Sequence, residues 1–454
     1  MPSLPEDSTH LELENPRQRD RLVAQAQAVI ALFSGGGARE GYLAATDQAI
    51  ISLSNFLATI ILARNASPTE LGVYGVGFIL LSLGRALQEG IVVQPLNVFG
   101  AVLDAATFKR YASSSAVLQL SLAGSLASAA ALGGWMLTRL GNDTAGPALF
   151  ALWSAFLTWQ LLEFCRRLLY TRRRIPSAVL ISALSNAARL GILIWWASQG
   201  TLSGTAGITA IAWGALIALL PGLWFSRGYW TRELYSLPYV WKNNWSFGRW
   251  VTGAALAGWI SVEFYPVLTA GMVSFAAAGA YRAVQNLVAP IHMLLRAIDT
   301  FLTPRAARLY GQGGRSAISR ELRLIYLAAG IPTIGILAIA VAFRVQLLHL
   351  LYGDTYLPYS QGVVLMALFY TLLFAYGPLQ SVFKAMRQSR PIFIANLAAM
   401  VTMFTIGILA IQRWGVYGTM GGQIVNALLV NLILWGSWVA MARKNVQPAE
   451  IVTP

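Results

Sequence analysis

The sequence predicts an all-α polytopic membrane protein, with 12 transmembrane helices in two pseudo-symmetric six-helix bundles around a central cavity. The first indication is composition: the 454 residues are 56% hydrophobic and only 11% charged, with a mean hydropathy of +0.58. A soluble protein of this length needs more polar surface. The second indication is a succession of long apolar runs separated by short polar breaks. The third is that basic residues gather in alternate breaks.

Twelve apolar runs are long enough to cross a bilayer as helices. The first two are joined by the short break Arg64–Pro68 and predict a helical hairpin. The spans are expected at about 45–64, 70–98, 113–138, 146–169, 177–198, 205–226, 248–270, 275–303, 323–343, 357–383, 391–411 and 418–441.

Basic residues set the expected orientation. Of the 33 lysines and arginines, 25 fall on one side of the membrane in this arrangement, 4 on the other and 4 within spans. Because basic loops stay in the cytoplasm, both termini are expected there. A short apolar stretch at 22–33 is expected to form a helix at the surface. The predicted parts are a cytosolic N-terminal segment (1–43), an N-terminal six-helix bundle (44–226), a cytosolic interfacial linker (227–247), a C-terminal six-helix bundle (248–441) and a cytosolic tail (442–454).

The linker between the halves is aromatic and basic, with Trp230, Trp241 and Trp245 beside Arg232 and Lys242. This composition is typical of a helix that lies on anionic lipid headgroups. A plain connection between two halves is the alternative, and the two interpretations are compatible.

The halves look related. Gly72-Val73-Tyr74 follows the first hairpin break, and Gly279-Ala280-Tyr281 follows the break between spans seven and eight, 207 residues later. Each motif opens a long span that carries mid-span charge. A parallel repeat of six helices is a known transporter plan, with the substrate site between the halves.

Charged residues inside spans two and eight are the strongest candidates for a site, because ionisable groups are costly in lipid. Arg85 and Glu89 lie one turn apart in span two, and Arg282, Arg296 and Asp299 fall on one face of span eight. Pro290 should kink span eight. If the two spans are counterparts, these side chains meet in a central cavity. Guanidinium groups supply forked donors for phosphate oxygens, so the cavity could receive a phosphate or diphosphate.

The alternative is that Arg85–Glu89 and Arg296–Asp299 are closed intrahelical ion pairs that only lock packing. Arg282 and Arg189 would still lack a partner in sequence. Arg189 lies mid-span in the fifth helix and can face either the cavity or a neighbouring helix. The substrate-binding candidates are therefore Arg85, Arg282, Arg296 and Arg189.

Three carboxylates are candidates for binding a coupling ion or balancing charge: Glu89, Glu263 and Asp299. Glu263 has no local cation in sequence, so it can bind a proton or Na⁺, or pair with a group on another helix such as Arg282.

Other polar residues have simpler interpretations. Asp47 is expected to cap a helix at the cytosolic mouth. Glu163 is expected to form a surface pair with Arg166 and Arg167, and His292 to be structural. The amides Asn396, Gln423, Asn426 and Asn431 are expected to bond between helices.

The sequence has no pattern typical of an enzyme. It lacks a nucleotide-binding loop and the His/Cys spacing of a metal site, its three histidines are scattered at 10, 292 and 349, and Cys165 is its single cysteine. No cofactor or metal is expected. The net charge of +15 is first a consequence of topology, so it does not indicate a nucleic-acid partner.

Three stretches resemble a known family: Ala63–Tyr74, which resembles that family's first hairpin, Leu351–Tyr356 before span ten, and Gly415–Gly418 before span twelve. The family is the polysaccharide-transporter branch of the MATE-like MOP flippase superfamily, which includes O-antigen and exopolysaccharide repeat-unit flippases. The resemblance implies two bundles in a V around an often cationic cavity that alternates between the two faces of the membrane. Arg85 and Arg282, with Arg296, match such cavity cations.

The resemblance implies a flippase in the bacterial inner membrane that moves polyprenyl-diphosphate-linked oligosaccharide for surface polysaccharide assembly. Implied partners are the lipid-linked glycan, membrane lipids, a coupling ion such as H⁺ or Na⁺, and the polysaccharide polymerase and glycosyltransferases. One alternative is a MATE-type multidrug or cation antiporter, whose site should be acidic and aromatic. Another is a membrane glycosyltransferase, which needs a larger outer loop than Arg344–Tyr356.

Overall fold

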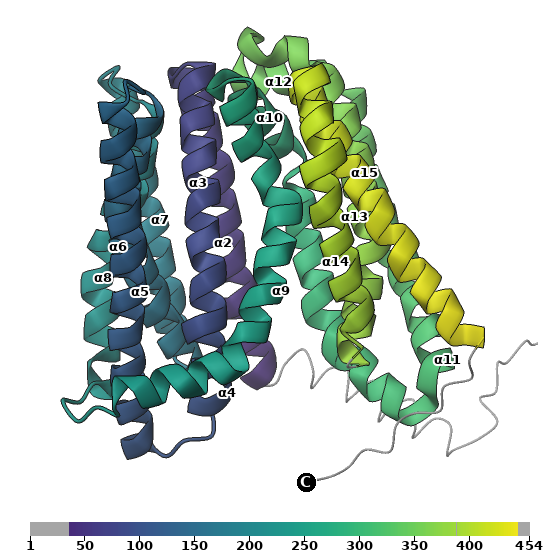
Figure 1. The fold of residues 1–454 in the computed structure, drawn as a ribbon. Coiled ribbons are helices and arrows are strands. Elements are labelled where there is room, and N and C mark those ends of the chain that lie inside the picture. Colours follow the sequence, from purple (N-terminus) through teal and green to yellow (C-terminus); the bar gives the residue numbers. More distant parts are fainter. Residues whose placement is uncertain (1–35, 387, 444–454) are drawn as a thin grey trace, which may run out of the picture.

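The computed structural model describes residues 36–386 and 388–443, and in these ranges the chain is built from helices without β-strands (Figure 1). The elements are α2 (Gly36–Asn65), α3 (Pro68–Gln88), η1 (Glu89–Val93), α4 (Gln94–Gly100), α5 (Ala105–Arg139), α6 (Ala145–Thr171), α7 (Ile175–Ser198), α8 (Gly204–Ser226), η2 (Arg227–Tyr229), α9 (Leu237–Met272), α10 (Phe275–Val288), α11 (Pro290–Ala342), α12 (Arg344–Tyr352), η3 (Asp354–Tyr359), α13 (Ser360–Ala385), α14 (Arg390–Thr402), η4 (Met403–Gly407) and α15 (Ile408–Arg443). Elements η1 and η4 are π-helical turns within longer helices.

The predicted twelve crossings are confirmed. Ten segments of the described chain are long and apolar enough to span a membrane. The last of them, Arg390–Met441, makes two crossings, because Gly415 breaks the helix with φ 54° and ψ −125°. Helix α10 and the part of α11 before Gly314, where φ is +58°, make one more (Figure 1). This crossing carries Arg282, Arg296 and Asp299.

The helix boundaries depart from expectation at two places. Helix α2 begins at Gly36, nine residues ahead of the predicted start near residue 45. Helix α9 begins at Leu237, inside the predicted linker. The expected kink at Pro290 is confirmed, because α10 ends at Val288 and α11 starts at Pro290. The predicted surface helix at 22–33 lies outside the described residues.

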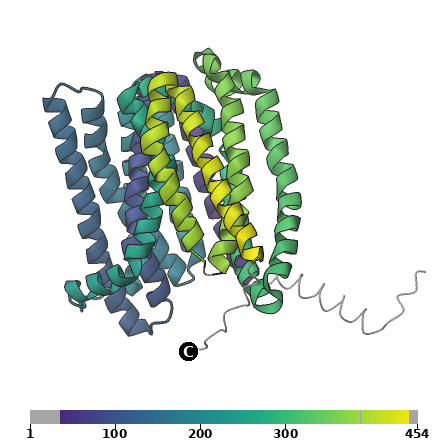
Figure 2. The ribbon, with the colours of Figure 1, turned by 45° about the vertical axis from the view of Figure 1, so that its right-hand side comes forward.

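Helices α2 to α8 pack on one another, as do α10 to α15 (Figure 1). In a view turned by 45°, helices of the two halves overlap, with late helices (yellow) in front of early ones (purple) (Figure 2). Helix α2 begins and α15 ends at the same end of the molecule (Figure 1). We call this the basic end, because most loop lysines and arginines lie in its connections. The other end is called the opposite end.

Helix α9 joins the two halves as one continuous helix. Near its start, the Asn244 side chain accepts a hydrogen bond from the Tyr111 hydroxyl (2.8 Å) and donates one to the Ile91 carbonyl (3.2 Å). Farther along, the carbonyl of Ser261 accepts a hydrogen bond from Asn426 in α15 (2.9 Å). The predicted boundary at residue 248 therefore lies inside a helix that belongs to both halves.

At the opposite end the halves meet closely. The Arg64 guanidinium at the end of α2 donates from Nε to the carbonyl of Leu351 (2.9 Å) and also bonds the carbonyl of Leu350, both in α12. Beside this contact, α3 and α10 cross with Gly72 against Gly279. Glycine is required at such a crossing because the two backbones approach without room for a side chain.

Candidate functional site

Four charged side chains from four helices gather between the two halves. Arg85 comes from α3, Glu263 from α9, Arg282 from α10 and Arg296 from α11. The charges that act on the Glu263 carboxylate are those of Arg282, Arg85 and Arg296, in decreasing order. Arg85 and Glu263 also act on Arg296. We call these four residues the central arginine group. All three guanidinium groups contribute favourable charge to the Glu263 carboxylate.

Arg282 is held in place by both halves. Its Nη1 donates to Oε1 of Gln285 one turn later (3.2 Å), and its guanidinium carbon lies 5.1 Å from the ring centre of Phe78 in α3. Its aliphatic stem has room beside Gly75, where a Cβ would lie 3.5 Å from Arg282 Cγ. The Nε of Arg282 is buried and makes no hydrogen bond within the described chain. Buried donors are normally satisfied, so this atom is available to an acceptor that enters the site.

Arg296 and Arg85 lie nearer the basic end. Arg296 is exposed, and its Nη1 donates to Oε1 of Gln48 in α2 (3.3 Å), which is a contact between the halves. Arg85 is half-buried. The predicted meeting of spans two and eight therefore brings Arg85, Arg282 and Arg296 into one electrostatic group. Glu263 joins it from span seven.

The alternative in which Arg85 and Glu89 form a closed ion pair is wrong. Glu89 stands at the start of the π-turn η1. It accepts a hydrogen bond from Gln94 Nε2 (2.8 Å) and pairs with Arg167 in α6 (3.6 Å). The π-turn breaks the 3.6-residue repeat on which the predicted pairing rests, and the neighbouring helix supplies the cation instead.

Glu89 belongs to a chain of ion pairs at the basic end. The carboxylate of Glu163 pairs with Arg166 (2.7 Å) and Arg167 (2.8 Å), and Arg166 also reaches Asp47 in α2 (2.5 Å). We call these five residues the ionic chain. Asp47 is only 2% exposed and Glu163 7%. The expected pairing of Glu163 with Arg166 and Arg167 is therefore confirmed, but the pair is buried and not at the surface. The expectation of a helix cap at Asp47 is wrong, because its carboxylate pairs with Arg166 inside the protein.

Asp299 also departs from its expected partner. It accepts hydrogen bonds from Ser381 and from Lys384 Nζ (3.3 Å) in α13, and from Thr303 in its own helix. In the described chain its ion pair is with Lys384 and not with Arg296. Neither closed intrahelical pair forms, so Glu89 and Asp299 balance cations outside the central arginine group.

Arg189 is separated from Arg282 by the rings of Tyr74 and Phe78, whose centres lie 6.3 Å apart. It is buried in the N-terminal half, where Nη1 donates to Oδ1 of Asn55 (2.8 Å) and Nη2 bonds the hydroxyl of Tyr74. Two partners on two helices are typical of a guanidinium that holds a bundle together. His292 lies against Tyr370, with Nε2 2.5 Å from the hydroxyl oxygen, which fits its structural interpretation.

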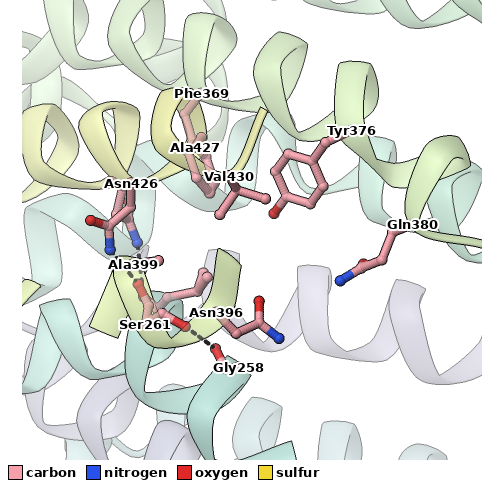
Figure 3. Close-up of a pocket in the computed structure, with 12 residues that line it drawn as sticks. Gly258, Ser261, Phe369, Tyr376, Gln380, Asn396, Ala399, Asn426, Ala427 and Val430 are labelled. Carbon is pink, nitrogen blue, oxygen red and sulfur yellow. Dashed lines mark hydrogen bonds between the residues drawn. The ribbon is translucent and has the colours of Figure 1, made fainter. Parts of the chain in front are cut away.

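The C-terminal half contains a cavity of about 180 Å³ between α9, α13, α14 and α15 (Figure 3). We call it the amide cavity. Its lining has no charged residue: Gly258, Ser261, Val262, Phe369, Tyr376, Gln380, Asn396, Ala399, Gln423, Asn426, Ala427 and Val430. Three of the lining amides, Asn396, Gln423 and Asn426, were expected to form hydrogen bonds between helices, as was Asn431 outside the cavity. The expectation is confirmed for Gln423, Asn426 and Asn431. The cavity was missed, because a lone Asn or Gln in an apolar run does not reveal where it points.

In the part of the chain that is described, no group of three or more His, Cys, Asp or Glu side chains is placed to hold a metal ion. Three of the four residues of the central arginine group are positively charged and can donate hydrogen bonds. Their chemistry is suited to holding an anionic ligand.

Comparison with solved structures assigns the fold. The chain matches the inward-facing conformation of a multidrug resistance MATE family transporter of the MOP superfamily, with a TM-score of 0.67, 15% identity, and 87% of this chain and 96% of that chain covered. It matches the lipid II flippase MurJ in an inward closed conformation, with a TM-score of 0.68 and 11% identity over 89% and 93% of the chains. A MOP superfamily transporter from Pyrococcus furiosus gives a TM-score of 0.61 and 14% identity over 90% and 96%.

The chain is therefore a multi-pass membrane protein with the fold of the MOP superfamily transporters, as the resemblance of its sequence implied. A family model, MatE, matches residues 259–409, which is about a third of the chain. No curated protein matches the sequence.

Proposed function

We propose that the protein is an inner-membrane flippase that moves polyprenyl-diphosphate-linked oligosaccharide across the bilayer by alternating access. The observation that supports the proposal is the central arginine group, in which the charges of Arg85, Arg282 and Arg296 act on the carboxylate of Glu263. A diphosphate is the part of such a lipid that cannot enter hydrocarbon. Taking an ion out of water into an apolar medium costs on the order of tens of kcal/mol.

The three arginines reduce this cost in a specific way. Each guanidinium offers a planar fork of donors that matches two phosphate oxygens, and it stays charged at any physiological pH. Arg282 has a buried Nε without a partner in the described chain. Binding a phosphate oxygen would give this donor a hydrogen bond. Glu263 limits the excess positive charge between transport cycles.

The arrangement of the two halves supports alternating access. Close contacts between backbones join them at the opposite end, through Gly72 and Gly279. At the basic end, Arg296 and Gln48 are joined by one long hydrogen bond of 3.3 Å between an exposed and a half-buried side chain. With the basic end in the cytoplasm, the lipid would enter from the cytoplasmic leaflet and leave after the halves rock apart at the opposite end.

Transport in liposomes tests the proposal. The purified full chain is reconstituted, and movement of a fluorescent polyprenyl-diphosphate oligosaccharide between leaflets is followed with a membrane-impermeant quencher. Arg282→Ala should reduce the protein-dependent rate at least about tenfold, since a charge-assisted hydrogen bond contributes roughly 1.5–3 kcal/mol. The matched control is Arg413→Ala, which removes an exposed arginine at the opposite end. Equal rates for wild type and Arg282→Ala would refute the proposal.

A second candidate, a MATE-type antiporter of organic cations, is favoured by the MatE match and by the position of Glu263. Here the half-buried carboxylate would bind the cation. Uptake of ethidium into energised vesicles separates the two functions. If the protein is a flippase, it should not transport ethidium. If it is an antiporter, it should transport ethidium, and this transport should be lost in Glu263→Gln and kept in Arg282→Ala.

A further inference from the structure

The amide cavity has no charged lining but exposes several polar groups. Figure 3 shows Gln380, Asn396 and Tyr376 around an open space, without dashed lines to other residues drawn. Within the described chain, none of these three side chains makes a hydrogen bond. The Oδ1 of Asn426 is buried and also has no partner there, although its Nδ2 donates to the Ser261 carbonyl (2.9 Å).

Unpaired polar atoms inside a membrane protein need a partner. An amide or hydroxyl without a hydrogen bond in an apolar setting costs a few kcal/mol, so such atoms normally face water or a ligand. The cavity is roomy enough for either. Its volume of about 180 Å³ far exceeds the space of about 10–15 Å³ that one water needs.

The cavity is connected to the central arginine group by a line of hydrogen bonds. Arg282 donates to Gln285, Gln285 donates to the hydroxyl of Tyr281 (3.1 Å), and this hydroxyl bonds the amide of Gln423 (3.0 Å). Gln423 lines the cavity, as does Val262, which is next to Glu263 in the chain. The lining of the amide cavity is therefore linked to Arg282 through two intervening side chains, Gln285 and Tyr281.

We propose that the amide cavity receives an uncharged sugar of the transported lipid while the diphosphate is held by the central arginine group. This inference rests on the proposed function and adds where the glycan binds. Amide and phenol side chains pair with hydroxyls as both donors and acceptors. A charged group finds no counter-charge in the lining, and a hydrocarbon tail would leave the polar atoms unpaired. A neutral group with several hydroxyls is the ligand that satisfies them.

The test compares two lipids on the purified full chain in nanodiscs: a polyprenyl diphosphate without sugar, and the same lipid with one neutral N-acetylhexosamine. Wild type should bind the sugar-bearing lipid about tenfold more tightly, as expected from two or three net hydrogen bonds. The variant Gln380→Leu/Asn396→Leu should lose most of this preference and keep its affinity for the lipid without sugar. Tyr376→Phe, which removes one hydroxyl, should lose part of it.

The control is Asn431→Leu, an amide on the same helix as Asn426 that bonds the carbonyls of Leu372 (2.9 Å) and Ala427 and does not line the cavity. It should keep the full preference. If wild type binds both lipids equally, with binding that still depends on Arg282, the sugar site is refuted while the flippase proposal stands. If wild type binds neither lipid, both proposals fail.

Discussion

Gly72 and Gly279 pack against each other although 207 residues separate them in the chain. A Cβ on Gly72 would lie 1.7 Å from the carbonyl oxygen of Phe275, and one on Gly279 would lie 2.1 Å from that of Pro68. The same motif position in each half thus forms a close backbone contact between the halves. The obstructing atoms are backbone atoms, so no side chain can rotate away to admit a larger residue.

Gly72→Ala should therefore push α3 and α10 apart at the opposite end. We expect a loss of thermal stability equivalent to about 1–3 kcal/mol, the usual cost of overpacking, together with greater labelling of a cysteine introduced at Ala278 by a membrane-impermeant thiol reagent. The Cys165→Ser background removes the natural thiol.

The control for this prediction is Gly124→Ala in α5, where a Cβ would meet nothing within 4 Å. It should be neutral or slightly stabilising, because alanine has a higher helix propensity than glycine. Unchanged labelling and stability in Gly72→Ala would mean that the helices do not seal the opposite end through this crossing.

The ionic chain should contribute to stability more than exposed pairs do. Removing one member of a buried ion pair leaves an uncompensated charge and costs about 3–5 kcal/mol. Glu163→Gln leaves Arg166 and Arg167 with fewer partners, and we expect a large drop in the melting temperature in detergent. The comparison is Lys384→Met, which breaks the half-exposed pair with Asp299 and should cost at most about 1 kcal/mol. Similar losses in both variants would contradict the prediction.

Variants of Arg189 and Arg282 should differ in whether stability or transport is lost. Arg189→Met removes the bonds to Asn55 and Tyr74 inside the N-terminal half and should lower stability by about 2–4 kcal/mol. Transport per folded molecule should change little. Arg282→Met should show the reverse, with little loss of stability and a large loss of transport. Melting curves and flipping rates on the same preparations check both. A strong transport defect in stable Arg189→Met would restore Arg189 as a substrate ligand.

The start of α9 should depend on anionic lipid. Trp241 and Trp245 stack with ring centres 5.4 Å apart and are 43% and 39% exposed, beside Lys242. Aromatic rings with adjacent cations favour the headgroup region. We expect native mass spectrometry to detect fewer retained anionic lipids in Trp241→Ala/Trp245→Ala. The exposed Trp195→Ala/Trp213→Ala variant, which alters tryptophans of α7 and α8, serves as the control.

Much of the fold follows from the sequence, because span length, loop charge and proline position each act locally. The break at Pro290 and the shared face of Arg282 and Gln285 are examples. Partners on other helices do not follow. The four-residue spacing was compatible with an ion pair between Arg85 and Glu89. In the structure Glu89 begins a π-turn and forms its ion pair with Arg167 of the neighbouring helix α6. Pairing across helices depends on packing that no pattern within one helix encodes.

Asp47 illustrates the same limit. Its place near the predicted start of the first span suggested that the carboxylate would cap a helix at the cytosolic mouth. The helix starts at Gly36, so Asp47 lies in its interior and meets Arg166 and Tyr170. Helix propensity contributes little to the free energy of folding, and tertiary packing overrides it.

Helix α9 is clamped at one end to the first half, through Asn244, and at the other to the second half, through Ser261. Figure 1 shows that α9 is bent, with its first turns lying across the basic end of the N-terminal half and the rest running along the other helices. A continuous helix fixed in two bodies does not let them turn as freely as a flexible linker would. Any rocking of the halves has to bend or twist the turns between these anchors, and the elastic energy stored there would return the molecule toward its starting shape. The helix that connects the repeats thus also opposes large rotations of one half relative to the other.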